Sequence, residues 1–134
     1  MEKSQIFGGT TMIEGINHTS FHIVAPEDTA IAQGSGQLKV LATPRLVALM
    51  ENAAMLTVAP SLSPEETTVG GQISITHLAP SAVGTEIAAT AVLEKVEGRK
   101  LTFSVSAKEG DKLIGEGTHI RFIVNKEKFM VKLK

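Results

Sequence analysis

The sequence contains no cysteine, no tryptophan and no tyrosine. Without cysteine the chain cannot form disulfides, use a thiolate nucleophile or bind zinc or iron–sulfur clusters through thiolates. Its five phenylalanines are too few for the ring-rich surface on which single-stranded nucleic acids stack. Side-chain chemistry in this protein must therefore come from oxygen and imidazole groups.

Neither charge nor hydrophobicity is concentrated in one place. Lysine and arginine total 13 against 14 aspartates and glutamates, for a net charge of −1, so no basic excess suits a phosphate backbone. No apolar run approaches the roughly 18 residues of a membrane span, and residues 1–9 lack the apolar core of a secretory signal. We expect no nucleic-acid or membrane partner and a cytoplasmic location, with which the lack of cysteine is compatible.

Length and hydrophobic content suit one folded unit. The chain has 134 residues, of which 43% are hydrophobic, and this composition excludes disorder. A globule of this size would bury about two-thirds of the surface that its unfolded chain exposes. No internal repeat or low-complexity segment divides the sequence, so we expect a single domain over residues 1–134.

The clearest predicted element is a helix over residues 43–59. Thr43 suits the N-cap and Pro44 the first helical position, and Pro60 ends the segment. Apolar side chains lie on nearly all sides of this helix, which is typical of a buried one. Residues 26–28 are predicted to form the first turn of a short helix, which ends at the glycines of residues 34–36. One more helical turn is predicted at residues 63–66, where a capping-box pattern occurs.

Alternation of polar and apolar residues predicts strands along most of the remaining chain. They are expected at residues 14–24, 72–78, 85–96, 100–108 and 113–124, with a short one near 129–133. Loops alone cannot cover a helix that is apolar on all sides, so the sheet must curve around it. The predicted fold class is α+β, a curved antiparallel sheet wrapped around one long central helix. Pairing of its free edges between two copies predicts a homodimer.

Glu51 is the main anomaly of the predicted helix. It is the only carboxylate between Asp28 and Glu65, and it shares a helix face with apolar residues such as Val47 and Ala54. A carboxylate among apolar side chains needs a partner, and such acids often mark functional sites. The alternative is that Glu51 points to solvent or makes a structural hydrogen bond.

Other polar residues each have a plain structural explanation. His77 shares a strand face with two isoleucines and by itself is compatible with a buried core histidine. His119 and Arg121 alternate on one strand face, where we expect them to be solvated. His18 and His22 would lie about 13 Å apart on a strand, too far for one metal ion to bridge, and no metal site is expected.

Together, several segments resemble the hot-dog-fold thioesterases, most closely the fluoroacetyl-CoA thioesterase group. The helix segment is Ala42-Thr43 followed by Val47-Ala48-Leu49-Met50-Glu51-Asn52-Ala53. The other matching segments are residues 69–77, which end in Thr76-His77, residues 96–107, residues 115–119 and residues 127–129. The resemblance covers about residues 40–130, and the strand–helix–meander order is what the hot-dog fold would give.

This resemblance implies hydrolysis of a short or medium acyl-CoA, without a metal or other cofactor. Thr43, Glu51 and His77 match the catalytic threonine, glutamate and histidine, Gly70 a glycine near the substrate, and Arg121 an arginine near the site. Glu51 could attack the thioester and form a mixed anhydride, or Glu51 or His77 could activate a water molecule. Thr43 or the backbone N–H groups at the start of its helix would stabilise the oxyanion.

Two alternatives use the same fold. One is a module that binds acyl-CoA or another small ligand without turnover, and the other is a hydratase. The presence of all three matching residues favours the thioesterase.

Two further expectations concern the site's geometry. Thr43 and Glu51 would lie roughly 12 Å apart along one helix. Either Thr43 lies before the first regular turn and folds back, or the partner chain supplies one of the two residues, and we expect the partner to do so. In the fluoroacetyl-CoA group, phenylalanines before the central helix form a lid, whereas residues 32–41 here contain no aromatic residue. We therefore expect no strong selection of fluoroacetyl-CoA.

Overall fold

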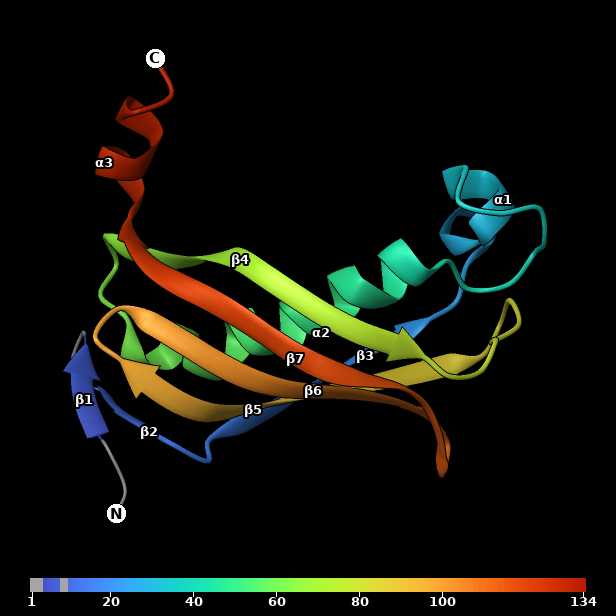
Figure 1. Ribbon diagram of the computed structural model, residues 1–134, viewed down its shortest axis with the longest axis horizontal. Coiled ribbons are helices and arrows are strands. Elements are labelled where there is room, and N and C mark those ends of the chain that lie inside the picture. The colour runs from blue at the N-terminus through green and yellow to red at the C-terminus, as the bar shows by residue number, and fades with distance from the viewer. Residues whose placement is uncertain (1–3, 8–9) are drawn as a thin grey trace.

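A computed structural model describes residues 4–7 and 10–134 and their side chains from Met12 onward (Figure 1). The expectation that residues 1–9 are not a secretory signal therefore concerns residues that lie partly outside the described ones. In the described part, no helix is long and apolar enough to cross a membrane.

Within residues 4–7 and 10–134, seven strands and five helical segments follow one another (Figure 1). The strands are β1 (Ser4–Phe7), β2 (Thr10–Ile13), β3 (Asn17–Ile23), β4 (Glu66–His77), β5 (Glu86–Glu97), β6 (Lys100–Glu109) and β7 (Lys112–Asn125). The α-helices are α1 (Ala30–Gln33), α2 (Thr43–Val58) and α3 (Lys126–Val131), and the 3-10 turns are η1 (Pro26–Asp28) and η2 (Ala59–Ser61).

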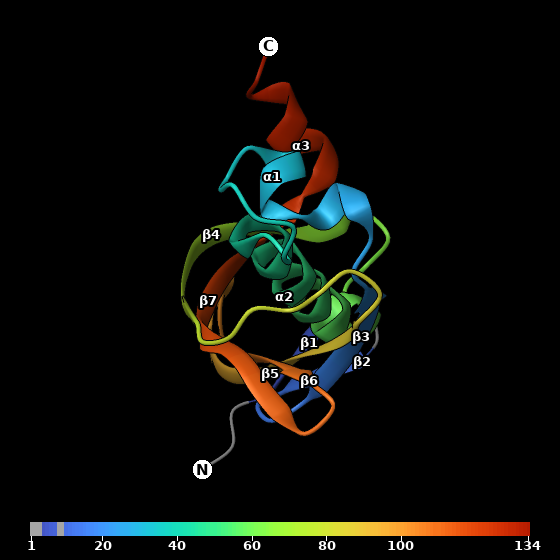
Figure 2. The ribbon, with the colours of Figure 1, turned by 90° about the vertical axis from the view of Figure 1, so that its right-hand side faces the viewer.

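Five strands form one antiparallel sheet in the order β3-β5-β6-β7-β4, and β1 pairs with β2 in a separate hairpin. Seen end-on, the larger sheet curves around α2 (Figure 2). This arrangement confirms the predicted α+β class with a curved sheet wrapped around one central helix. The strands β3 and β4 are the two edges of the larger sheet.

The core forms between α2 and the concave face of the sheet. The buried side chains of α2 include Leu46, Leu49, Met50, Ala53 and Val58. They belong to the same buried cluster as inward-facing residues of β5 and β6 such as Ile87, Leu93, Leu101 and Phe103. On β7, Gly115 admits the helix, because a Cβ there would lie 3.0 Å from Leu46 Cδ2.

Three local predictions were wrong. The tail is helix α3 and not a strand at 129–133, because the Asn125 side chain caps a new helix by accepting from Lys128 N at 3.0 Å. Residues 63–66 make capping-box contacts but no helix, since Glu66 already pairs with Asn125 in the sheet. The N-cap of α2 is Ala42, so Thr43 and Pro44 are its first two helical residues.

Candidate active site

Thr43 and His77 meet at one end of the central helix. Thr43 begins α2 and His77 ends β4, and their Oγ1 and Nδ1 atoms lie 2.7 Å apart. Thr43 is exposed, whereas His77 is half-buried between the sheet and the helix. The fold therefore joins two predicted site residues that are 34 positions apart in sequence.

The surroundings of His77 indicate which nitrogen carries the proton. Burial lowers the pKa of His77, and a backbone acceptor at Ala79 partly opposes that shift. Nε2 is buried without a well-formed hydrogen bond to any described residue, and the Ala79 acceptor favours the N–H on that nitrogen. The neutral ring then accepts the Thr43 hydroxyl hydrogen at Nδ1.

This pair borders a pocket of about 320 Å³. The lining residues come from the segment before α2, from α2 itself and from the end of β4: Ala30, Ser35, Val40, Leu41, Thr43, His77, Leu78, Ala79 and Pro80. Except for the Thr43–His77 pair and Ser35, the lining is aliphatic. Such a lining suits a small apolar group held beside a reactive polar pair.

The start of α2 also offers a backbone donor. Pro44 has no N–H, and Ala42 N donates to Asp28 O at 2.9 Å. The N–H of Thr43 makes no backbone hydrogen bond within the described part of the chain. A free N–H at a helix N-terminus is suited to a developing negative charge.

A second polar group surrounds Glu51 in the middle of α2. A Cβ on Gly70 would lie 3.1 Å from Glu51 Oε2, 3.4 Å from His119 Cε1 and 3.6 Å from an Arg121 terminal nitrogen. The missing side chain of Gly70 thus lets these three groups approach the strand backbone closely. Gly70 also adjoins a β-bulge between Gly70 and Gln72, a feature that re-aims neighbouring groups.

Arg121 is a buried cation with fixed contacts. Its Nε donates to Thr68 Oγ1 at 2.8 Å, and its two terminal nitrogens donate to Thr68 O at 2.9 Å and to His119 Nε2 at 3.2 Å. Burial lowers the pKa of Arg121, and the nearby charge of Glu51 opposes that shift. Glu51 and Arg121 interact through space but form no direct ion pair in the described residues.

His119 orients this arginine. Its Nδ1–H donates to Gln72 O at 2.8 Å, which leaves Nε2 to accept from Arg121. Burial lowers the pKa of His119, and the charge of Arg121 lowers it further. His119 is therefore held in one neutral tautomer, with its ring beside Gly70.

The expectation that His119 and Arg121 are solvated was wrong, since they are only 1% and 7% exposed. They share the inward face of β7 with Gly115 and Ile123. That alternation was visible in the sequence, because Gly115 and Ile123, which lie on either side of the pair, are an even number of residues away and so share its strand face. In the part of the chain that is described, no cluster of histidines and carboxylates could hold a metal ion.

Within one chain the two polar groups remain separate. Thr43 and Glu51 are eight residues apart on one helix, which corresponds to roughly 12 Å along its axis. Thr43 lies with His77, whereas Glu51 lies with Gly70, His119 and Arg121. One thioester carbonyl cannot contact both groups within a single chain.

Comparison with solved structures defines the class of the fold. A hot-dog-like protein from Thermanaerovibrio acidaminovorans superposes with a TM-score of 0.81 over 90% of this chain and 89% of its own, at 19% identity, which supports the fold alone. A thioesterase superfamily member from Thermus thermophilus is 30% identical, with a TM-score of 0.83, over 90% of this chain and 89% of its own. The protein is thus of the hot-dog thioesterase class.

More specific similarity extends over most of the chain. The family model for fluoroacetyl-CoA-specific thioesterase matches residues 24–127. The fluoroacetyl-CoA thioesterase of Streptantibioticus cattleyicolor is 38% identical over 117 residues, 87% of this chain and 82% of the relative. A crystal structure of the fluoroacetyl-CoA thioesterase FlK has a TM-score of 0.86 at 37% identity, over 91% of this chain and 95% of its own. The chain belongs to this family and is an acyl-CoA thioester hydrolase.

Proposed function

We propose that this enzyme hydrolyses short and medium acyl-CoA thioesters to the free acid and CoA in the pocket beside Thr43 and His77. The observation that carries the proposal is the 2.7 Å contact between Thr43 Oγ1 and His77 Nδ1 at the wall of an aliphatic pocket. The acyl group would occupy the pocket, and its carbonyl would lie at the start of α2. We also propose a cytoplasmic location, with which the absence of cysteine is compatible.

In this proposal each site residue has a distinct role. Because the Thr43 hydroxyl donates to His77, the free N–H of Thr43 would stabilise the oxyanion. Glu51 would act on the carbonyl carbon, either as the nucleophile that forms an anhydride or as the base that activates water. In both routes the C–S bond breaks, one water molecule is consumed, and CoA leaves as the thiol. Arg121 would supply a positive charge near Glu51, and Gly70 would let Glu51 lie close to the backbone of β4.

The proposed site is completed by a second copy of the chain. As an edge strand, β4 leaves one side of its backbone unpaired, and its residues 67–76 contain no charged residue or proline that would discourage pairing. Antiparallel pairing of β4 between two chains would bring Gly70 of one protomer towards the partner's His77. Glu51 would then face the partner's Thr43 across one substrate, and the protein would be a homodimer.

A panel of acyl-CoA substrates tests the function. Thiol release from acetyl-, butyryl- and hexanoyl-CoA is expected, with preferences graded by chain length, because one methylene in an apolar pocket changes binding by only about 1–3 kcal/mol. Tight binding without thiol release would instead identify a binding module, and addition of water to an enoyl-CoA would identify a hydratase.

The enzyme is expected not to select fluoroacetyl-CoA over acetyl-CoA by a large factor. Among the described side chains, no phenylalanine lines the pocket, and a closed surface of such rings is one means of excluding water around a small fluorinated group. Val40 and Leu41 line the pocket, but Leu38 is 69% exposed. Phe21 is 64% exposed and lies outside the lining, whereas the side chain of Phe7 belongs to the undescribed part.

The measurement is the ratio of kcat/KM for the two substrates. A preference for fluoroacetyl-CoA beyond about a thousandfold, some 4 kcal/mol of transition-state discrimination, would overturn this expectation. The same ratio for butyryl- and hexanoyl-CoA against acetyl-CoA serves as the internal control, since it reports how the pocket responds to size alone.

The pH profile is expected to follow the depressed pKa of His77. Because burial lowers this pKa below its ordinary value of 6.5, neutral His77 predominates at pH 7, and kcat/KM should fall only as the pH drops below about 6.5. An acidic limb with its midpoint above that value would contradict the assignment.

Protein stability serves as the control for the pH profile. In the unfolded state, histidines protonate at their ordinary pKa, whereas His77 and His119 resist protonation in the fold. Stability is therefore full above the ordinary pKa and is lost as the pH falls through it towards the folded values. Thermal unfolding recorded at each pH separates this loss from a change in catalysis.

A further inference from the structure

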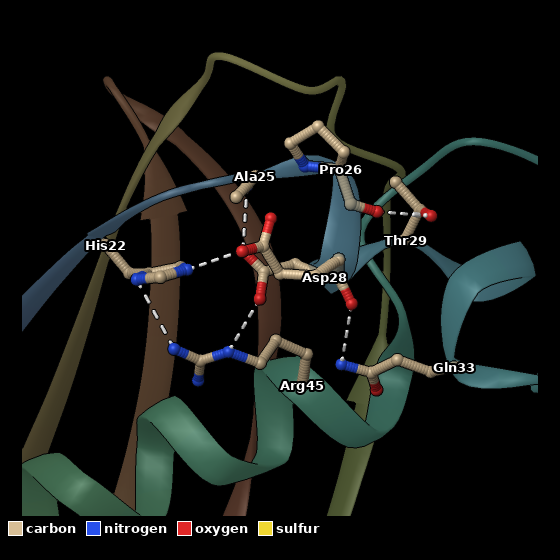
Figure 3. Close-up of polar contacts among 8 residues, drawn as sticks. His22, Ala25, Pro26, Asp28, Thr29, Gln33 and Arg45 are labelled. Carbon is tan, nitrogen blue, oxygen red and sulfur yellow. Dashed lines mark hydrogen bonds and ion pairs between the residues drawn. The ribbon is translucent and has the colours of Figure 1, made fainter.

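Asp28 is a buried carboxylate that two side chains and one backbone N–H contact (Figure 3). Its Oδ2 accepts from Ala25 N at 2.7 Å and from His22 Nε2 at 2.6 Å, and its Oδ1 accepts from Arg45 Nε at 3.0 Å. A terminal nitrogen of Arg45 also donates to His22 Nδ1 at 3.3 Å. Strand β3, turn η1 and helix α2 are thus joined at one side chain.

Asp28 contacts the chain on both sides of Thr43. The main-chain oxygen of Asp28 accepts from Ala42 N at 2.9 Å, directly before Thr43. Its carboxylate holds Arg45, two residues after Thr43. The first turn of α2 is therefore fastened to one residue on both sides of the threonine that contacts His77.

The same segment forms a wall of the pocket. Thr29 pairs with Leu41 in an antiparallel bridge, Ala30 N donates to Val40 O at 2.8 Å, and Leu41 N donates to Ser81 O at 2.9 Å. Ala30, Val40 and Leu41 line the pocket beside Thr43. Displacement of Asp28 would shift this wall and the first turn of α2 together.

Charge strengthens the contact. Burial raises the pKa of Asp28, but the hydrogen bonds from Ala25, His22 and Arg45 outweigh that effect and hold the pKa below its ordinary value. Asp28 is therefore a carboxylate throughout the neutral range. Hydrogen bonds between charged groups are stronger and more directional than neutral ones, so the ionised form favours a single geometry.

We infer that Asp28 is a positioning residue that, together with Arg45, fixes Thr43 for contact with His77 and with the substrate. This inference rests on the proposed function, because it assumes a catalytic role for Thr43. In this inference, a charged side chain holds the segment before α2 in place as a fixed wall of the pocket. Residues 32–41 of that segment contain no aromatic residue.

The test compares Asp28→Asn with two matched controls. Glu27→Gln makes the same chemical change on the neighbouring exposed residue. Glu66→Gln removes a carboxylate that accepts from Ser63 and pairs with Arg99 at 3.1 Å, outside the pocket lining. Because the Glu66 variant also loses a charged contact, it reports the effect of lost stability alone.

In Asp28→Asn, kcat for acyl-CoA is expected to fall roughly tenfold to hundredfold, because small misplacements of reacting groups have effects of that size. KM should change by less than about threefold, and neither control should lower kcat by more than about twofold. If Asp28→Asn fails to fold, Arg45→Lys provides the same comparison, since lysine keeps the charge but loses the planar guanidinium.

A second readout needs no substrate. The ¹⁵N chemical shift of His77 Nδ1 reports its hydrogen bond to Thr43 in the free protein, and it should change in Asp28→Asn but not in Glu66→Gln. An unchanged His77 signal, or an equal loss of kcat in Glu66→Gln, would overturn the inference. If the parent enzyme releases no thiol from any acyl-CoA, the proposed function is wrong. If Thr43→Ala keeps full activity, the role of Thr43 on which this inference rests is wrong; if Thr43→Ala is inactive and Asp28→Asn is fully active, only the role of Asp28 is wrong.

Discussion

Replacing Glu51 by glutamine is expected to lower kcat by roughly a thousandfold or more, the range seen when an enzyme loses a group that acts on the reacting atoms. Glutamine has nearly the same shape, but its amide is neither an effective nucleophile nor a base. The Glu51 side chain lies beside Gly70 and near the buried charge of Arg121. KM should change little, because the carboxylate acts on the transition state and not on the CoA moiety.

Steady-state thiol release with acetyl- and butyryl-CoA measures this effect. Glu116→Gln is the matched control, because Glu116 is an exposed residue of β7, three residues before His119. Its kcat should stay within about twofold of the parent enzyme. Activity of Glu51→Gln at more than about a tenth of the parent would remove Glu51 from the chemistry.

A single-turnover reaction in ¹⁸O-labelled water separates the two routes open to Glu51. If the carboxylate attacks the thioester and water then cleaves the anhydride at the Glu51 carbonyl carbon, the first acid released carries an unlabelled oxygen from Glu51, and the label enters the enzyme. If Glu51 activates water, the label appears in the acid during the first turnover. An unlabelled first acid, detected by mass spectrometry, therefore identifies the anhydride route.

The architecture could be predicted because its signals are local and periodic. An apolar helix after Thr43 and the alternation in residues 85–124 each require a buried environment, and only a curved sheet around the helix supplies both. The tail was mispredicted because Phe129, Met130 and Val131 read as a strand, whereas the capping contact of Asn125 favours a helix.

The candidate site was less accessible to prediction from sequence. The contact between Thr43 and His77 depends on where β4 ends relative to α2, and no spacing in the sequence specifies this. Arg121 binds Thr68, 53 positions away, so its burial depends on the pairing of β7 with β4. The link between Asp28 and Arg45 likewise joins residues 17 positions apart, and no spacing in the sequence specifies it.

Mixing two inactive subunits is expected to restore activity if each site draws Thr43 from one chain and Glu51 from the other. A heterodimer of Thr43→Ala and Glu51→Gln chains then keeps one intact site, formed by the unaltered Thr43 of one protomer and the unaltered Glu51 of its partner. Such heterodimers should show about half the activity of the parent dimer. If each chain carried its own complete site, both sites would be defective and no activity would return.

The reciprocal pairing makes this test decisive, because it reverses the expectation. In a heterodimer of the parent chain and a chain carrying both substitutions, every shared site lacks one of the two groups, so activity should be nearly absent. A site contained in one chain would instead leave about half of the parent activity. Two affinity tags isolate the heterodimers, and light scattering should give twice the 14.2 kDa chain mass. Recovery in the first pairing together with loss in the second follows only from a site that spans two chains, since the 12 Å or so between Thr43 and Glu51 on one helix cannot change between the two experiments.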